Sequence, residues 1–465
     1  MDSISMNDPG ITPGPSLVPG RKITVLGAAR SGLAVAELLR LHGAAVFLSE
    51  TAPASEKRDA ARRLARSGIP AEFGGHSDRA LEADWLVVSP GIPPDAPVLR
   101  EARQKTVPVL GEIEVASWFS RAPIAAVTGS NGKSTVTTLI GETFRLSGRP
   151  TVVAGNIGQA FSEEVEKTVP EGVAVLEVSS FQLETVHRFH PKVAVFLNLT
   201  QDHINWHGTF EAYGKTKARI FDNQTADDNL VLCGMDRGVL ALSRNAKPAK
   251  LLFGLSEAEG PHGFVRNGVL TVRPFGGEES LLPAGDLGIR GEHNVLNALA
   301  AALACRIMGV EPETIRKAFK SFKGLPHRLE FVLESGGVRW INDSKGTNVD
   351  SVRYALGSFQ NPIVLIAGGR DKNSDFTALN DLLRRCARSV VLIGEAAEKM
   401  EKAFHGVCPV TRAATLREAV EKARGLARPG DVVLLSPACA SFDMFRNFED
   451  RGDQFKSLVR EVTGS

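Results

Sequence analysis

The sequence predicts an α/β protein of several domains, in which parallel, doubly wound sheets alternate with helices. Two observations carry this prediction. Short apolar runs that end in glycine-rich or polar turns alternate with runs of helical periodicity. The chain has 465 residues, and at about 100–200 residues per domain this length favours three domains.

The alternation is clearest near the start of the chain. Lys22–Leu26 is predicted as a buried strand that enters a glycine turn, Gly27–Gly32, and then a helix over Leu33–Leu41. Two more predicted strands, 45–48 and 85–88, follow the same pattern. These elements predict a parallel sheet with helices on its faces.

Three units and a tail are predicted along the chain. Residues 1–20 are rich in Pro, Gly and Ser and lack periodicity, so we expect a flexible tail. The first unit covers 21–111. A second, 112–324, contains apolar strands around a phosphate-binding sequence, and a third, 325–465, returns to strand–helix alternation.

Composition excludes several classes of protein. Net charge is +2 without a basic block, so the footprint of a nucleic-acid-binding protein is absent. No apolar run reaches the roughly 18 residues that span a bilayer, and the N-terminus lacks a secretory pattern. Five scattered cysteines without CxxC spacing indicate reduced thiols, and we therefore expect a cytoplasmic protein.

A phosphate-binding loop is the most specific motif. Gly129, Ser130, Asn131, Gly132, Lys133 and Ser134 lie between a predicted strand, 124–127, and a predicted helix, 135–146. Backbone N–H groups at a helix start favour phosphate, and Lys133 would hold the β- and γ-phosphates. The spacing is two residues shorter than the usual G-x4-G-K-[ST]. The alternative is a glycine turn with a solvated lysine. We favour an ATP-using enzyme.

Other candidate residues follow neighbouring strands. Glu177 ends an apolar strand, where a carboxylate is well placed for Mg²⁺. Taken alone, it is equally explained as a solvated turn residue. Asp202 and His203 follow the next strand, although a lone histidine is more often structural. Lys217 lies in a predicted helix, where a lysine is usually solvated.

Together, seven runs resemble the Mur ligases of peptidoglycan synthesis, and among them the D-glutamate-adding member. The resemblance covers residues 22 to 460. It rests on Thr128–Thr135, Gly155–Gly158, Leu176–Glu184, Thr200–His203, Gly324–Arg328, Asn342–Asn348 and Ser436–Asp443. The Asp-Asn-Pro-Arg signature of the diaminopimelate- or lysine-adding relative is missing.

The resemblance implies a three-domain fold. Rossmann-like N- and C-terminal domains would flank a central P-loop ATPase domain with a mostly parallel sheet. It also implies a reaction in which the carboxylate of UDP-N-acetylmuramoyl-L-alanine attacks the γ-phosphate of ATP. D-glutamate then attacks the acyl phosphate. The implied cofactors are ATP and Mg²⁺ at two sites, and we expect a monomer without nucleic-acid or membrane partners.

The resemblance also implies residue roles. Lys133, His203 and Lys217 would be catalytic, Lys217 as a carbamate, and Ser134, Glu177, His203 and Lys217 would bind metal. The remaining ATP contacts would be Gly129, Ser130, Asn131, Gly132, Thr135, Val136, Asn294, Asn297, Arg328 and Asp343. The UDP-substrate would contact Arg30, Ser31, Thr51, Gly91, Asn156, Ser179 and Gln182, and D-glutamate would contact Lys345, Thr347, Lys372, Ser441 and Phe448.

Three alternatives remain open at this point. Another Mur-type or folylpolyglutamate-type ligase would add a different amino acid. An NAD(P)-dependent oxidoreductase would use the turn at 27–32, but Ala29 stands where the fingerprint needs its middle glycine. A nucleotide-switch module would bind without chemistry. Arg30, Glu50 and Arg370-Asp371 also depart from the family pattern and put local substrate contacts in doubt.

Overall fold

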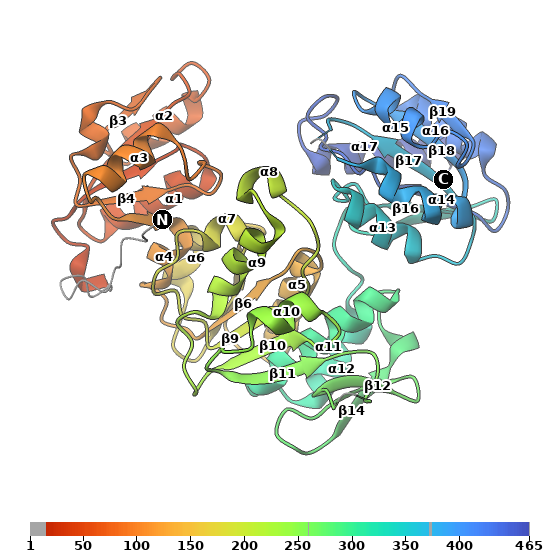
Figure 1. Ribbon diagram of the computed structural model, residues 1–465, viewed down its shortest axis with the longest axis horizontal. Coiled ribbons are helices and arrows are strands. Elements are labelled where there is room, and N and C mark those ends of the chain that lie inside the picture. The colour runs from red at the N-terminus through yellow and green to blue at the C-terminus, as the bar shows by residue number, and fades with distance from the viewer. Residues whose placement is uncertain (1–14, 259, 372–373, 465) are drawn as a thin grey trace. The chain divides into compact units, whose positions relative to one another are not determined.

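The computed structural model describes residues 15–258, 260–371 and 374–464 (Figure 1). It contains three sheets, each combined with helices, which confirms the predicted α/β class. Within the described residues, no helix is both long enough and apolar enough to cross a membrane.

The chain forms two compact units. The first runs to Asp286 and takes up Leu296–Lys320, and it contains the first two sheets. The second consists of Leu287–Val295 and Ser321–Ser465 and contains the third sheet. The long helix α11, Glu292–Ile307, contributes residues to both units.

The N-terminal sheet is entirely parallel, with strand order β3-β2-β1-β4-β5. Its strands are β1 (Lys22–Leu26), β2 (Ala45–Glu50), β3 (Ala71–Phe73), β4 (Trp85–Val88) and β5 (Val109–Gly111), and its helices are α1 (Arg30–Leu41), α2 (Arg58–Arg66) and α3 (Pro97–Gln104). The order places β1 in the middle, so the turn after it lies at the carboxyl edge where ligands of such sheets bind.

The segment before β1 is more ordered than expected. Residues 1–14 lie outside the described part of the chain, but Pro15–Leu17 form a short 3-10 helix. Val18 is fully buried in the core beneath the first sheet, and the N–H of Gly20 donates to the carbonyl of Gly43 at 2.9 Å. Residues 15–20 therefore belong to the folded domain, because burial of the Val18 side chain removes apolar surface from water and stabilises this position of the segment.

The second sheet has nine strands in the order β14-β13-β12-β11-β10-β9-β6-β8-β7. They are β6 (Ile124–Thr128), β7 (Thr151–Gly155), β8 (Val173–Glu177), β9 (Val193–Phe196), β10 (Asn229–Cys233), β11 (Ala249–Phe253), β12 (Gly263–Arg266), β13 (Val269–Val272) and β14 (Glu279–Pro283). The two antiparallel pairs are β12–β13 and β13–β14, so β13 alone runs against the other strands. The two-residue turn Asn267-Gly268, with both φ positive, joins β12 to β13 in a tight hairpin. The prediction of a mostly parallel sheet is confirmed.

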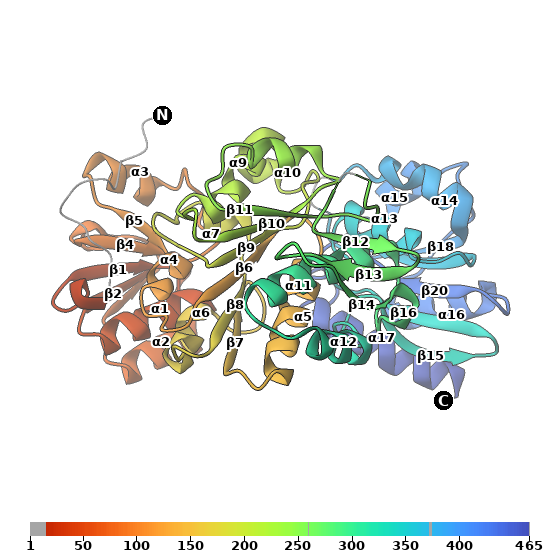
Figure 2. The ribbon, with the colours of Figure 1, turned by 90° about the horizontal axis from the view of Figure 1, so that it is seen from below.

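Helices cover both faces of this sheet. Figure 2 shows α9 (Phe210–Ala218) and α10 (Arg237–Leu242) on one side and α5 (Lys133–Leu146) on the other. The remaining helices are α4 (Glu112–Ser117), α6 (Phe161–Glu164), α7 (Ser180–Leu183), α8 (Ile204–His207), α11 and α12 (Pro312–Ser321). The helix α5 is fully buried along Val136, Leu139 and Ile140, so the loop before it is held against the sheet.

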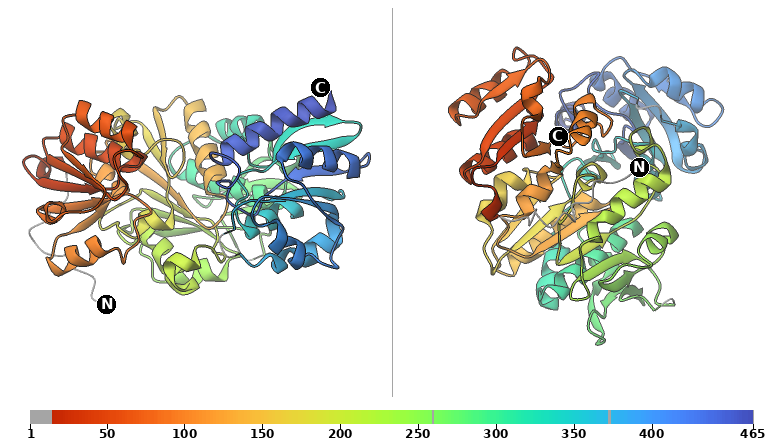
Figure 3. Two further views of the ribbon diagram at one scale, coloured as in Figure 1. Left: turned by 90° about the horizontal axis from the view of Figure 1, so that it is seen from above. Right: turned by 60° about the vertical axis from the view of Figure 1, so that its left-hand side comes forward.

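The third sheet has the order β15-β16-β20-β17-β18-β19, with only β15 antiparallel. The strands are β15 (Glu330–Ser335), β16 (Val338–Asn342), β17 (Ile363–Gly368), β18 (Ala387–Ile393), β19 (Val410–Arg412) and β20 (Val432–Leu435). The helices are α13 (Val349–Gly357), α14 (Asn380–Cys386), α15 (Ala397–Ala403), α16 (Leu416–Leu426) and α17 (Phe448–Thr463), the last of which leads to the C-terminus in Figure 3. Side chains of β20 alternate between two buried clusters on opposite faces.

Gly368, at the end of β17, provides a test of this packing. Its φ is +118°, and a Cβ there would lie 1.9 Å from the carbonyl oxygen of Ile393 on β18. We expect Gly368→Ala to lower the free energy of unfolding of the third domain by more than about 2 kcal/mol, because backbone must move. Thermal and urea unfolding measure the change.

Gly357, at the end of α13, is the matched control, since nothing lies within 4 Å of a Cβ built there. Gly357→Ala should leave the unfolding midpoint unchanged or raise it slightly. Equal midpoints for the two variants would contradict the packing described for β17 and β18.

Candidate active site

The phosphate loop follows an interior strand of the second sheet. Its strand, β6, pairs with β8 on one side and β9 on the other. Glu177 ends β8, and the segment 198–203 follows β9. Because parallel strands present their carboxyl ends at one edge, the fold brings the loop, Glu177 and the 198–203 segment to the same edge.

Residues from the neighbouring segment hold the loop in place. The side chain of Asn198 accepts from the N–H of Asn131 at 2.8 Å and donates to its carbonyl at 3.0 Å. Ser130 Oγ donates to the carbonyl of Thr200 at 3.0 Å and lies 3.2 Å from the hydroxyl of Tyr213. Asn198 and Tyr213 were not among the predicted site residues. The only sequence signal for Asn198 was its place directly after a predicted strand, and Tyr213 lies in a helix, α9, where nothing marked it.

The close approach of helix α11 explains one glycine of the loop. Gly132 has a φ of +86°, and a Cβ there would lie 2.5 Å from Oδ1 of Asn297. Asn297 is buried, and both residues belong to the first unit. The structure therefore places Asn297, a predicted ATP contact, directly against the loop. Its predicted companion Asn294 donates through Nδ2 to the carbonyl of Arg290 at 2.7 Å.

Two lysines converge on the loop. Nζ of Lys133 donates to the carbonyls of Gly129 and Ser130 at 2.8 and 2.9 Å. Nζ of Lys217, from α9, donates to the same Gly129 carbonyl at 2.9 Å and lies 4.7 Å from the centre of the Tyr213 ring. The side chain of Lys217 is fully enclosed. The structure thus brings Lys133 and Lys217, which are far apart in the sequence, to the same carbonyl oxygen.

The surroundings of Lys217 strongly disfavour its charged form. Burial lowers its pKa well below the usual value for a lysine, and the nearby charge of Lys133 lowers it further. Asp202 and Glu177 act in the opposite direction but do not reverse the shift. This lowering of the pKa favours the uncharged amine, which carries a free electron pair.

Glu177 has one oxygen without a protein partner. Its Oε1 accepts from Nδ2 of Asn156 at 2.7 Å, whereas Oε2 is buried and has no hydrogen-bond partner among the described residues. Ser134 and Thr135, in the first turn of α5, are also buried. A buried carboxylate oxygen and a buried serine hydroxyl at the same edge of the sheet fit a magnesium ion, which prefers oxygen ligands.

Within the described part of the chain, no three His, Cys, Asp or Glu side chains form a group that could hold a metal ion. The predicted ligand set does not require such a group, because it includes the hydroxyl of Ser134 and a modified Lys217. The donors therefore fit Mg²⁺ better than they would fit a histidine- or cysteine-bound transition metal.

His203 occupies a constrained turn after β9. Its φ is +53°, its N–H donates to Oδ1 of Asp202 at 2.9 Å, and its ring meets Phe181 edge-on with centroids 4.7 Å apart. The neighbouring His207 was not predicted. Burial lowers the pKa of His207 to about 4, with further lowering by His203 and Lys217, so its ring is neutral near pH 7 and contacts Ser180 Oγ at 3.0 Å.

The predicted UDP-substrate residues divide into two groups. Gly91 and Gln182 line a pocket of about 500 Å³ between the end of β4 and α7, together with Phe181 and Trp206. The lining of this pocket does not include the other five, which are Arg30, Ser31, Thr51, Asn156 and Ser179. Gln182 and Ser179 also bond to each other as the N-terminal cap of α7, with Ser179 N–H donating to Gln182 Oε1 at 3.0 Å.

In the second unit, two loops carry the predicted D-glutamate residues. Nζ of Lys345 lies 5.7 Å from the ring centre of Phe448, and Ser344 Oγ donates to the Phe448 carbonyl at 2.7 Å. Thr347 follows on the same loop, where its N–H donates to the Lys345 carbonyl at 2.9 Å, and Ser441 is buried on the other loop. Lys372 lies outside the described residues.

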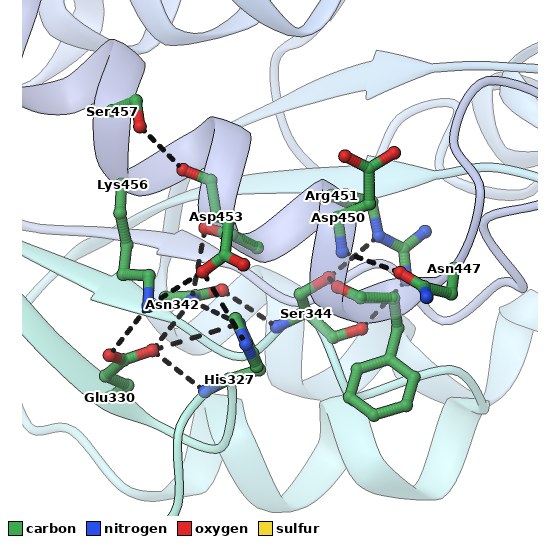
Figure 4. A network of polar contacts seen from close by, with 12 residues as sticks. His327, Glu330, Asn342, Ser344, Asn447, Asp450, Arg451, Asp453, Lys456 and Ser457 are labelled. Carbon is green, nitrogen blue, oxygen red and sulfur yellow. Dashed lines mark hydrogen bonds and ion pairs between the residues drawn. The ribbon is translucent and has the colours of Figure 1, made fainter.

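Arg451, on α17, ties these two loops together and was not predicted. It is fully buried, and its guanidinium donates to Ser344 Oγ at 3.0 Å and to the Ser344 carbonyl at 2.8 Å (Figure 4). It also donates to the Cys439 carbonyl at 3.3 Å. Burial lowers its pKa to about 10, so it remains charged at neutral pH. No sequence signal separates Arg451 from the other arginines of the chain.

Asp343 lies at the end of β16 near Arg328. Its Oδ2 accepts from Ser436 Oγ at 2.7 Å and its Oδ1 from the N–H of Leu329 at 3.2 Å. Burial raises its pKa to about 6, although the charge of Arg328 and these hydrogen bonds lower it. The structure thus groups Arg328 and Asp343, both predicted as nucleotide contacts, within the second unit.

Comparisons with known proteins agree along the chain. Three family models match, described as the MurD-like N-terminal domain of Mur ligases at residues 21–111, the Mur ligase middle domain at 127–305, and the Mur ligase glutamate ligase domain at 327–439. Their order reproduces the three sheets of the structure. Together they match more than half of the chain.

Curated relatives extend over nearly the whole length. A protein of Salinibacter ruber named UDP-N-acetylmuramoylalanine–D-glutamate ligase is 47% identical, covering 96% of this chain and 99% of the relative. A protein of the same name from Pelotomaculum thermopropionicum is 44% identical, covering 94% and 97%.

Solved structures share the fold at lower identity. MurF from Acinetobacter baumannii superposes with a TM-score of 0.62 at 19% identity, covering 90% of this chain and 91% of that one. A pseudomurein peptide ligase type C from Methanothermus fervidus gives 0.61 at 19% identity, covering 95% and 100%. With the family models and the near-full-length relatives, these similarities show that the chain belongs to the Mur ligase family.

Proposed function

We propose that this chain uses ATP to join D-glutamate to UDP-N-acetylmuramoyl-L-alanine, in the cytoplasmic synthesis of peptidoglycan precursors. The observation that carries the proposal is the identity of 47% over 96% of the chain to a ligase of that name. The phosphate loop, Glu177 and Lys217 support it, because they supply the groups that carboxylate activation by ATP requires. We expect the protein to act as a monomer.

The first step would form an acyl phosphate. The L-alanyl carboxylate attacks the γ-phosphorus, the bond to the β-phosphate oxygen breaks, and ADP leaves. Lys133 would move from the carbonyls of Gly129 and Ser130 onto the phosphate oxygens as the nucleotide enters. Backbone N–H groups at the start of α5 would stabilise the growing negative charge.

The second step would form the amide. The uncharged amine of D-glutamate attacks the acyl carbon, a tetrahedral intermediate forms, and inorganic phosphate leaves as the proton of the amine is lost. In the proposal, Lys345, Thr347, Ser441 and Lys372 bind the two carboxylates of D-glutamate, for which cations and hydroxyls are suited, and Phe448 contacts the same amino acid. Arg328, Asp343, Asn294 and Asn297 bind the nucleotide.

Mg²⁺ would neutralise phosphate charge and orient the transferred group. Ser134 and Glu177 would hold one ion, and His203 with carbamylated Lys217 the other. The unpartnered Oε2 of Glu177 supports the first assignment. The second rests on the lowered pKa of Lys217, because only an uncharged amine reacts with carbon dioxide to give a carbamate.

The substrate specificity is tested directly with purified protein. ADP release should require ATP, Mg²⁺, UDP-N-acetylmuramoyl-L-alanine and D-glutamate together, and the product should carry one added glutamate by mass spectrometry. L-lysine or diaminopimelate should not replace D-glutamate. Turnover that prefers one of those amino acids would move the chain to another branch of the family.

The role of Lys217 is tested by chemical rescue. Lys217→Ala should lose at least about 100-fold in kcat, because an oxygen ligand for metal is removed. Added formate or acetate should restore part of the activity, since a small carboxylate fits the space left by the carbamate. Thr216→Ala, one residue earlier on α9, is the control and should behave like the wild type. Full activity of Lys217→Ala without additives would exclude the carbamate.

Glu177 is tested through its metal requirement. Glu177→Gln should raise the Mg²⁺ concentration that gives half-maximal activity about tenfold or more, because the amide cannot provide a charged oxygen. Glu171→Gln, in the exposed turn before β8, removes a carboxylate of the same type and should leave the Mg²⁺ profile unchanged. Overlapping Mg²⁺ titrations for the two variants would refute the assignment.

A further inference from the structure

The backbone around Arg328 has an unusual conformation. His327 and Leu329, on either side of it, have φ values of +63° and +45°. A side chain at Cβ makes this left-handed region costly, and two such residues flanking a third need strong support from their surroundings. Such strain is commonly found where a side chain must be held in one orientation for function.

One carboxylate provides much of that support. Oε2 of Glu330 accepts from the N–H of His327 at 2.8 Å and from Nδ2 of Asn342 at 2.9 Å, while Oε1 accepts from Nζ of Lys456 at 3.1 Å (Figure 4). Glu330 starts β15, Asn342 ends β16 and Lys456 lies on α17. Glu330 therefore fixes the strained turn to three elements of one domain.

The His327 ring completes this network. Its Nδ1 lies 3.1 Å from Nδ2 of Asn342, and the ring is buried against α17. A Cβ on Gly452 of that helix would lie 2.1 Å from Nδ1, so the glycine makes room for the ring. Burial lowers the pKa of His327, and the charge of Lys456 lowers it further, so the neutral ring accepts the hydrogen bond from Asn342. The carbonyl of His327 accepts from the N–H of Lys345 at 3.0 Å.

We propose that Glu330, supported by Lys456, is a positioning residue that holds the turn 327–329 so that Arg328 is presented to the nucleotide. Glu330 makes no contact with substrate in this role and acts through Arg328. The inference rests on the proposed function, in which Arg328 contacts ATP. It adds Glu330 and Lys456 to the residues on which that function depends. Position 330 requires a carboxylate, because a carboxylate accepts hydrogen bonds on both oxygens whereas an amide accepts on only one atom.

The test is a double-mutant cycle between Glu330 and Arg328. Glu330→Ala should raise KM for ATP about tenfold, because the turn 327–329 that carries Arg328 loses its charged hydrogen-bond acceptor. KM for UDP-N-acetylmuramoyl-L-alanine should stay within about twofold, since that substrate does not depend on Arg328. Arg328→Ala should also raise KM for ATP. In the Arg328→Ala background, removal of Glu330 should add less than about twofold, because its effect passes through the missing side chain.

Two outcomes would overturn the proposal. An unchanged KM for ATP in Glu330→Ala would show that the turn does not need the carboxylate. Fully additive effects in the double variant would show that Glu330 stabilises the domain without acting through Arg328. Glu461→Gln is the control. Glu461 lies on α17, as Lys456 does, and pairs with Arg417 of α16 at 2.7 Å, so its loss should leave KM for ATP unchanged.

A second pair of variants covers the case in which Glu330→Ala does not fold. The amide of Glu330→Gln has one acceptor and one donor end, so it cannot satisfy His327, Asn342 and Lys456 together, and KM for ATP should rise. Adding Lys456→Gln supplies an acceptor for that amide and should return KM toward the wild-type value. A double variant no better than Glu330→Gln would count against the proposal.

The test separates this inference from the proposed function. If the wild-type protein does not add D-glutamate, the proposed function fails before any variant is measured. The same cycle is then read as the affinity for a non-hydrolysable ATP analogue by calorimetry. Non-additivity between Glu330 and Arg328 in that measurement would support the positioning role, and additivity would refute it.

Discussion

The carbonyl oxygen of Gly129 accepts hydrogen bonds from two lysines, and the arrangement of the active site depends on this shared acceptor. Lys133, from the loop itself, and Lys217, from α9, reach it at 2.8 and 2.9 Å. Two full positive charges cannot be held this closely in a buried site without a large electrostatic cost. The protein meets the constraint by enclosing Lys217, so that burial and the charge of Lys133 both disfavour its charged form, while Lys133 stays partly exposed.

The consequence is a division of labour between residues of the same type. In the proposed function Lys133 serves as the cation for phosphate, whereas burial favours the uncharged form of Lys217, the form that a carbamate requires. Asn198 and Tyr213 also hold the loop, through contacts with Asn131 and Ser130. They therefore help to fix the backbone that carries the Gly129 carbonyl, to which both lysines donate. A shorter phosphate loop suits this design, since fewer residues separate Gly129 from Lys133 and the lysine folds back onto its own loop.

Much of this could be predicted from the sequence, and the exceptions have physical reasons. The strand–turn–helix at 124–146 was predictable because apolar periodicity and glycine chemistry are local properties. Val18 was missed because a single apolar residue in a Pro- and Gly-rich run carries no periodicity. Arg451 was missed because its partners are backbone carbonyls and one serine hydroxyl, which leave no pattern in a sequence. Ser179 and Gln182 were predicted as substrate contacts, and only the structure reveals that they also cap α7.

The way in which Arg451 joins the two loops of the third domain affects which substitutions these loops can accept during evolution. Its guanidinium donates to the backbone carbonyls of Ser344, Cys439 and Ala440. These hydrogen bonds would form whatever side chains those three positions carried. A chain can therefore exchange residues along the loops while their frame stays in register. If these loops bind the amino-acid substrate as proposed, a buried guanidinium of this kind holds the shape of the binding surface while substitutions change its chemistry, so few of them would alter the amino-acid preference.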